Sequence, residues 1–311
     1  MAWQLADDVG AYLAAAGGFL RADAVRNTIM LGVAGALQSR GPAAFGDALP
    51  LCGWWTEPDG AVGAALLQTP PHPILLTVLP PGAATALAAE LAGRGHHPPA
   101  VNAAPGPAAE FAAAWKERTG RVSRPGMRMR LYALDRLLPP DPAPPGQAWT
   151  ALETDRDLLF AWFDAFHDEA APPGPRETQQ VVDDRLSFGG LVLWEQAGVP
   201  VSVAGRTKPV AGLARIGPVY TPPEHRGRGF GGAATAAATQ AALDAGAEGV
   251  LLFTDLANPT SNTLYQRLGF APITDQIVLT FTDPLPKPSA RADLSPFPHG
   301  QTGTIQARKR A

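Results

Sequence analysis

Cysteine is almost absent from this chain of 311 residues, which contains Cys52 alone. A single cysteine excludes an internal disulfide and a cysteine-rich zinc site. Because Cys52 lies near Trp54 and Trp55, we interpret it as a small buried hydrophobe. The six histidines show no metal-ligand spacing, so we expect no metal centre. The cysteine usage is consistent with a reducing compartment.

Long apolar runs and an excess of positive charge are also lacking. The longest apolar-looking stretch, residues 29–37, is far shorter than the ~18 residues of a membrane span. Lys and Arg number 25 against 28 Asp and Glu, which argues against a general nucleic-acid binder. Asp7 and Asp8 come early without a basic leader, so we expect no export signal. These features predict a cytoplasmic protein with no membrane or nucleic-acid partner.

Hydrophobic residues make up 46% of the chain, enough for two packed domains. Five prolines fall within residues 139–146, where neither a helix interior nor a central strand tolerates them. We therefore predict a stiff linker there. It separates a first domain, residues 1–138, from a second, residues 147–283. Residues 284–311 are rich in Pro, Ser, Gly and Arg and are predicted to be disordered.

Hydrophobic periodicity predicts alternating strands and helices in both halves. In the first half, strands are expected at 51–56, 61–69, 74–79 and 127–134, and helices at 23–39, 83–91 and 108–118. In the second half, strands are expected at 149–152, 191–196, 200–208, 210–220, 250–254 and 277–281, and helices at 155–169, 177–186, 233–245 and 260–268. The loosely shared order indicates a divergent internal duplication.

A glycine-rich loop separates the strand 210–220 from the helix that follows. The first N–H groups of a helix lack partners and lie at its positive end, where phosphate binds well. Gly227, Gly229 and Gly231 let the backbone approach an anion closely, and Arg226 and Arg228 add charged donors. These residues predict a diphosphate-binding site.

The same residues also match G-x-G-x-x-G, the dinucleotide fingerprint, over 227–232. In that fingerprint the first glycine directly follows the strand. Here a polar segment, residues 222–226, intervenes, and the loop comes late in the chain after several strands. A nucleotide-dependent oxidoreductase is therefore the less favoured reading.

Two motifs make a closer match. Arg226-Gly227-Arg228-Gly229-Phe230-Gly231, preceded by Pro223-Glu224-His225, resembles the Arg/Gln-x-x-Gly-x-Gly/Ala cofactor segment of the GNAT superfamily of N-acetyltransferases. The segment 258–270 resembles the second signature of that family, Asn-x(6)-Tyr-x-x-x-Gly-Phe. The resemblance implies an α/β fold of the α+β kind. Its sheet would be mixed, mostly antiparallel and flanked by helices, in two tandem GNAT-like lobes.

The resemblance also implies a role for each matching residue. Val219 and Thr221 would pair with the pantetheine arm of acetyl-CoA, and the Val219 N–H would face the thioester carbonyl. Asn258 would hydrogen-bond the pantetheine, although it also suits a helix N-cap before Pro259. Tyr265 would face the departing sulfur as the catalytic residue, or else serve as a core aromatic. The diphosphate would lie against the loop residues Arg226, Gly227, Arg228, Gly229, Phe230 and Gly231.

The implied activity is transfer of an acetyl group from acetyl-CoA to an amine, on a small molecule or a protein, by direct attack in a ternary complex. The strand 213–219 carries no carboxylate to act as base. Glu169, Asp168, His167 and Asp255 are candidates, and a chain of water molecules would also serve. We expect the acceptor to contact the loop 170–176 and the first lobe.

The first half lacks the Arg-x-x-Gly-x-Gly motif, so we expect no CoA binding there. It resembles the degenerate lobe of two-lobed members, including the mycothiol-synthase type, and would cover the acceptor site or mediate homodimer contacts. An unrelated α+β domain is the alternative. For the whole chain, the alternative to an enzyme is a non-catalytic CoA-binding regulatory module.

Overall fold

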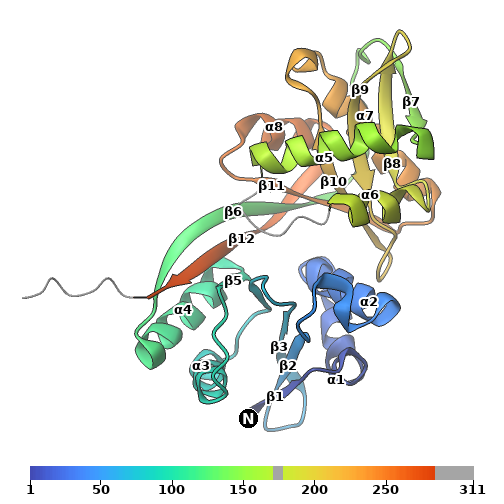
Figure 1. Cartoon of the computed structure of the whole chain (residues 1–311). Coiled ribbons are helices and arrows are strands. Elements are labelled where there is room, and N and C mark those ends of the chain that lie inside the picture. The colour runs from blue at the N-terminus through green and yellow to red at the C-terminus, as the bar shows by residue number, and fades with distance from the viewer. Residues whose placement is uncertain (171–177, 284–311) are drawn as a thin grey trace, which may run out of the picture.

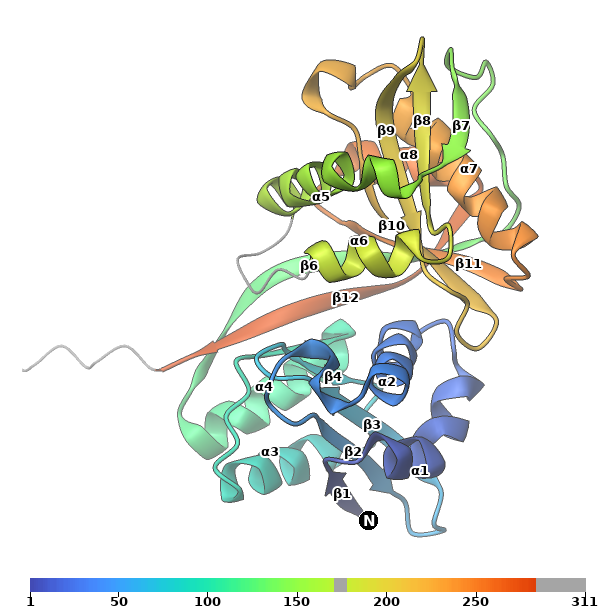
Figure 2. The ribbon, with the colours of Figure 1, turned by 45° about the vertical axis from the view of Figure 1, so that its right-hand side comes forward.

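The computed structural model describes residues 1–170 and 178–283. They form one twelve-stranded sheet with helices on both faces (Figures 1 and 2). The strand order is β1-β2-β3-β4-β5-β12-β6-β11-β10-β9-β8-β7. Among the described strands, β4–β5 and β10–β11 pair in parallel and all other neighbours are antiparallel. The predicted fold class, a mixed and mostly antiparallel α+β sheet, is therefore confirmed.

The first half of the chain contains β1 (Ala2–Ala6), α1 (Val9–Ala22), α2 (Thr28–Arg40), η1 (Pro42–Phe45), β2 (Leu51–Thr56), β3 (Val62–Gln68), β4 (Ile74–Leu76), α3 (Ala83–Gly93), β5 (Ala100–Ala103), α4 (Pro105–Thr119) and β6 (Val122–Leu134). The second half contains β7 (Gln147–Thr150), η2 (Glu153–Asp155), α5 (Arg156–Ala170), α6 (Thr178–Leu186), β8 (Leu191–Gln196), β9 (Val199–Arg206), β10 (Leu213–Tyr220), η3 (Pro223–His225), α7 (Phe230–Asp244), β11 (Gly249–Asp255), α8 (Pro259–Arg267) and β12 (Phe270–Thr282).

Apart from the short 3-10 turns, both halves follow the order β-α-α-β-β-β-α-β-α-β. The order in the sheet repeats too, from β1 to β5 at one edge and from β7 to β11 at the other. The final strands are exchanged, because β6 pairs with β11 and β12 pairs with β5. Figure 1 shows these two long strands crossing between the lobes. The chain is therefore two tandem lobes joined by exchanged strands; its division at residues 139–146 stays a prediction.

Each face of each lobe has its own hydrophobic core. In the first lobe, α1 and α2 pack on one face and α3 and α4 on the other. In the second lobe, α5 and α6 cover one face and α7 and α8 the other. In the second lobe, α5 and α6 therefore lie on one side of β10, and α7, which follows the glycine loop, lies on the other side.

Two strands and one α-helix of the first half were not predicted: β1, β5 and α1. The helix α1 begins at a clear signal, since the Asp8 carboxylate accepts from Gly10 N at 2.6 Å and Ala11 N at 3.3 Å. In β5, four residues give too short a pattern for periodicity to identify. Cys52 is fully buried, as predicted, and burial raises its pKa to about 12.

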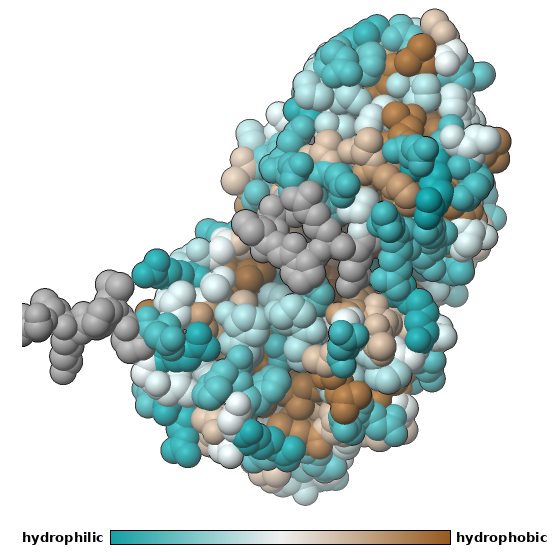
Figure 3. Space-filling model, in the orientation of Figure 1, coloured by the Kyte–Doolittle hydropathy of each residue, from teal (hydrophilic) through white to brown (hydrophobic). Residues whose placement is uncertain are grey.

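None of the described helices has the length and apolar character needed to cross a membrane. On the face seen in Figure 3, hydrophobic residues form separate areas among hydrophilic ones. The predicted disorder of residues 284–311 lies outside the described residues, and so does the predicted acceptor loop 170–176 except for Ala170, the last residue of α5.

Candidate active site

The parallel strands β10 and β11 separate partway along their length. They pair from Leu213 and Gly249 to Ile216 and Leu252. Beyond this point β10 continues to Tyr220 and β11 continues to Asp255, but the two strands no longer pair with each other. Over the same stretch β10 stays paired with β9. The second half of β10 therefore has one bonded edge and one open edge, and the open edge faces the gap beside β11.

A bulge in β10 causes this separation. Between Ile216 and Val219, Gly217 and Pro218 together face Gly205 of β9. A bulge of this kind bends the strand and increases its twist, and Pro218 has no N–H with which to continue the ladder. The guanidinium of Arg185, on α6, donates a hydrogen bond to the Gly217 carbonyl. The bulge thus turns the end of β10 away from β11.

The backbone of Val219 is directed toward the gap. Ser202 Oγ, on β9, donates to the Tyr220 carbonyl at 3.0 Å, so Tyr220 directs its backbone groups toward β9. Neighbouring residues of a strand direct these groups to opposite edges. The N–H and C=O of Val219 therefore face the open edge, next to Thr221, whose hydroxyl lies 2.9 Å from Ser202 Oγ. Contact of Val219 and Thr221 with a pantetheine arm stays a prediction.

The helix α7 begins beside this gap with its first N–H groups unpaired inside the helix. Gly229 is the N-cap and offers no side-chain cap. The first intrahelical hydrogen bond runs from Ala233 N to Gly229 O, at 3.1 Å. The amides of Phe230, Gly231 and Gly232 accordingly point out of the helix end, at the positive end of its dipole. This geometry suits a diphosphate.

The two loop arginines have partners within the second lobe. Arg226 Nε donates to the Thr221 carbonyl at 2.8 Å, and its Nη2 lies 2.6 Å from a carboxylate oxygen of Glu169 on α5. Arg228 Nη2 donates to Gln196 Oε1 at 2.7 Å. Both side chains thus hold the loop against neighbouring elements. The backbone amides of the loop are available as donors, and a phosphate contact by either arginine stays a prediction.

Asn258 caps α8, as the sequence allowed. Its Oδ1 accepts from Ser261 N at 3.0 Å, while its carbonyl accepts from Asn262 Nδ2 at 2.7 Å. No hydrogen bond to another described residue occupies its Nδ2, which leaves this donor for a ligand. The cap is confirmed, and the contact with pantetheine stays a prediction.

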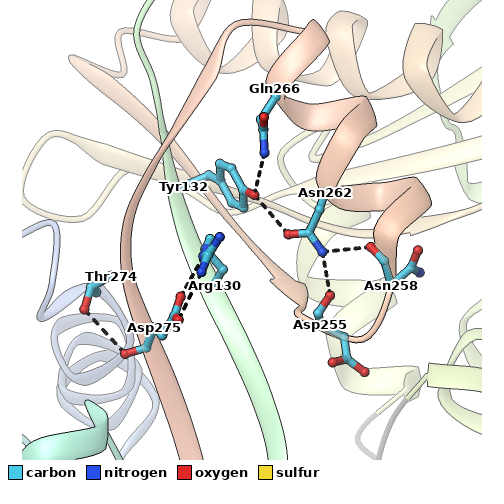
Figure 4. A network of polar contacts seen from close by, with 8 residues as sticks. All are labelled: Arg130, Tyr132, Asp255, Asn258, Asn262, Gln266, Thr274 and Asp275. Atoms are coloured by element: carbon cyan, nitrogen blue, oxygen red, sulfur yellow. Dashed lines mark hydrogen bonds and ion pairs between the residues drawn. The ribbon is translucent and has the colours of Figure 1, made fainter.

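Asn262 connects α8 to the exchanged strand β6, which the sequence did not reveal. Its Nδ2 also donates to the Asp255 carbonyl at 2.8 Å, and its Oδ1 accepts from the Tyr132 hydroxyl at 2.9 Å (Figure 4). Gln266 donates to the same hydroxyl at 3.2 Å. The network fixes the end of β11 and the start of α8, so a strand contributed by the first half supports the Asn258 turn.

Tyr265 is both a core aromatic and a candidate catalytic residue. Its side chain is 8% exposed and packs edge-on to Phe270, with ring centroids 6.4 Å apart. It shares a core cluster with Ile216 and Leu252, the last pair before the strands separate. The hydroxyl makes no hydrogen bond with another described residue, and burial raises its pKa to about 12. The phenol thus stays protonated at neutral pH.

Of the candidate bases, Glu169 contacts the end of β10. Its carboxylate accepts from the Tyr220 hydroxyl at 3.3 Å and pairs with Arg226. His167 is hydrogen-bonded through Nδ1 to the Phe163 carbonyl, and Asp255 accepts from Ala257 N in a tight turn. Among the described residues, no group of His, Cys, Asp and Glu could hold a metal ion.

The matching position of the first lobe is filled by aromatic side chains. There α3 follows β4, and its N-cap, Gly82, also has a left-handed backbone and no side-chain cap. The first helical residue, Ala83, is fully buried in a cluster with Trp55 and Trp3. Trp3 Nε1 donates to the Ala83 carbonyl at 2.8 Å. That the first lobe does not bind CoA stays a prediction.

Comparison with known families gives a match in the same region. The profile of the acetyltransferase (GNAT) family matches residues 154–270. This segment runs from η2, just before α5, to the first residue of β12 and contains the gap, the loop and both Asn258 and Tyr265. No curated protein matches the chain as a sequence relative.

Solved structures match nearly the whole chain. A GCN5-related N-acetyltransferase from Sphaerobacter thermophilus is 19% identical with a TM-score of 0.59, over 89% of this chain and 94% of that one. A GNAT-family acetyltransferase from Colwellia psychrerythraea is 10% identical with a TM-score of 0.57, over 90% and 99%. A Drosophila protein is 11% identical with a TM-score of 0.62, over 89% and 98%. At these identities the matches establish the fold, with both lobes included.

Proposed function

Because the second lobe belongs to the GNAT acetyltransferase superfamily, we propose that this chain is an N-acetyltransferase that uses acetyl-CoA as acyl donor. The acceptor is an amine, on a small molecule or a protein, and attack is direct within a ternary complex. The observation that carries the proposal is the open edge of β10 beside the uncapped start of α7.

These features match the two ends of the donor. The backbone of Val219 and the Thr221 segment would pair with the amide groups of pantetheine, as an added strand does. The amides of residues 227–231 would hold the diphosphate. A Cβ at Gly231 would lie 3.1 Å from Thr221 Oγ1, so glycine there lets the start of α7 lie close to β10. The Nδ2 of Asn258 would complete the site from α8.

The reaction forms an N–C bond and breaks the C–S bond. The amine nitrogen attacks the thioester carbonyl, the thiolate leaves, and the amine proton passes to a base or to water. The Val219 N–H stabilises the charge on the carbonyl oxygen. The pKa of Tyr265, about 12, exceeds that of a thiol, ~8.5, so full proton transfer is uphill by ~5 kcal/mol. Tyr265 therefore acts by donating a hydrogen bond to the sulfur.

The proposal is tested by calorimetry with acetyl-CoA and by release of free CoA thiol in the presence of a panel of amines. We expect binding of acetyl-CoA, no binding of NAD, and amine-dependent thiol release. Binding without release for any amine would favour the non-catalytic CoA-binding module. Absence of acetyl-CoA binding by the folded protein would refute both.

A further inference from the structure

Two arginines of the second lobe lie on the same face of the sheet beside the β10 bulge. Arg185, on α6, donates to the Gly217 carbonyl. Arg215 precedes Gly217 by two residues on β10, so its side chain lies on the face of the sheet to which position 217 belongs. Burial, followed by the charge of Arg215, lowers the pKa of Arg185 to about 10. Burial likewise lowers the pKa of Arg215 to about 10, so both guanidinium groups stay charged at neutral pH.

Glycines make room for both guanidinium groups. A Cβ at Gly205 would overlap Arg185 Nη1, and a Cβ at Gly32 would lie 3.0 Å from Arg215 Nη2. Gly32 belongs to α2 of the first lobe, and Arg215 Nη1 donates to the Thr28 carbonyl of that helix at 3.1 Å. The pair therefore lies where the two lobes meet.

Neither arginine has a carboxylate partner among the described residues. Arg130 and Arg156 each form paired hydrogen bonds with an aspartate, at 2.7–3.1 Å and 2.7–2.8 Å. Arg185 and Arg215 instead donate to backbone carbonyls. Asp184 acts to raise the pKa of Arg185, but it is exposed and forms no ion pair with it. Two like charges withdrawn from water without a counter-charge are unfavourable unless an anion joins them.

We propose that Arg185 and Arg215 bind an anionic group, a carboxylate or a phosphate, of the acceptor amine. Guanidinium groups suit both anions because their donors form a planar fork. The inference rests on the proposed function and narrows its acceptor class. The bulge at Gly217 is where the gap beside β10 begins. An anion held there leaves the amine of the same molecule at the open edge, next to the Val219 amide.

The test compares matched amines in the thiol-release assay. Glycine, phenylalanine and glutamate are each paired with their α-amides, and O-phosphoethanolamine is paired with ethanolamine. We expect kcat/KM to favour the anionic member of at least one pair by a factor on the order of 10–100. Preference in the amino-acid pairs identifies a carboxylate, and preference in the last pair a phosphate.

Arg185→Gln and Arg215→Gln should each remove this preference by raising KM for the anionic amine, with KM for acetyl-CoA unchanged. Arg156→Gln is the control, because Arg156 is on the same lobe but is paired with Asp183. Arg215→Lys keeps a positive charge near Thr28, so it should fold and should retain part of the preference. This variant provides the test if Arg215→Gln does not fold.

A second measurement does not depend on turnover. At constant ionic strength, the preferred anionic amine should raise the thermal unfolding midpoint of the wild type more than its neutral partner does. This difference should be lost in Arg185→Gln and kept in Arg156→Gln. Equal behaviour of all matched pairs in both assays, or a preference that survives in Arg185→Gln, would overturn the inference. Failure of acetyl-CoA binding alone would refute the proposed function while the unfolding measurement still tests the arginine pair.

Discussion

Gly229 offers a direct test of the diphosphate site, through replacement by aspartate and, separately, by asparagine. The two side chains have nearly the same size and differ in charge. Gly229 has φ of +83°, a left-handed conformation that Asp and Asn adopt more readily than most residues. A Cβ there would lie 3.7 Å and 3.8 Å from carbons of Pro144, which are ordinary contacts. Both variants therefore carry a similar strain of ~1–2 kcal/mol.

The charge should separate the two variants in binding. At ~6 Å from a phosphate charge, a carboxylate is repelled by ~0.7 kcal/mol at the dielectric constant of water and by ~3 kcal/mol at an effective value of ~20. Gly229→Asp should thus bind CoA on the order of 3- to 100-fold more weakly than Gly229→Asn. Because salt screens partly exposed charges, this ratio should fall as ionic strength rises.

The thermal stability of the two variants should differ in the opposite direction from their CoA affinity. A negative charge in the first turn of a helix is favourable by ~0.3–1 kcal/mol. Gly229→Asp should therefore unfold at the same temperature as Gly229→Asn or slightly higher, although it binds CoA less well. General damage to the fold cannot produce this combination.

The assay is titration calorimetry with CoA at two salt concentrations, together with thermal unfolding of each variant. Gly82→Asp and Gly82→Asn are the matched controls, because Gly82 is the left-handed N-cap of α3 in the other lobe, with φ of +82°. They should leave CoA affinity unchanged. Equal affinities of Gly229→Asp and Gly229→Asn would show that no diphosphate binds at the start of α7.

Tyr265→Phe should lower kcat on the order of 10- to 100-fold with KM for acetyl-CoA and the unfolding midpoint nearly unchanged, because the hydroxyl has no protein partner among the described residues; unchanged kcat would make Tyr265 a core residue only. Gly269→Ala should destabilise the protein by at least ~2 kcal/mol in urea unfolding, since φ is +93° and a Cβ would overlap the Arg136 carbonyl; wild-type stability would refute this reasoning. Hydrogen bonding to Arg130 lowers the pKa of Asp275, so the ionised carboxylate stabilises the folded state at pH values above the unfolded-state pKa of ~3.9. In that pH range, Asp275→Asn should lower the free energy of unfolding by under ~1 kcal/mol. That loss should vanish as pH falls through the lowered folded-state value, and an equal loss in urea unfolding at pH 7 and pH 2 would contradict the assignment.

Local sequence signals were sufficient for most of the second lobe. The glycines at 227, 229 and 231 identified the loop, and two of them have the positive φ that glycine adopts without strain, +74° and +83°. Asn258 before Pro259 identified the start of α8 for a similarly local reason. In the first lobe, the pattern of α1 was too rich in alanine and glycine to stand out.

The sequence alone determined the elements whose geometry depends on neighbouring residues: the loop, the helix caps and the alternation of strands and helices. The tertiary structure decided everything that depends on residues distant in the chain. The exchange of β6 and β12, the support of Asn262 by Tyr132 and the hydrogen bond of Arg185 to Gly217 all join segments more than 25 residues apart. A periodic pattern specifies which side of a strand is buried, but it carries no information about which strand lies next to it. The partners of Arg226 were likewise hidden, because Glu169 reaches it only once α5 packs against the end of β10.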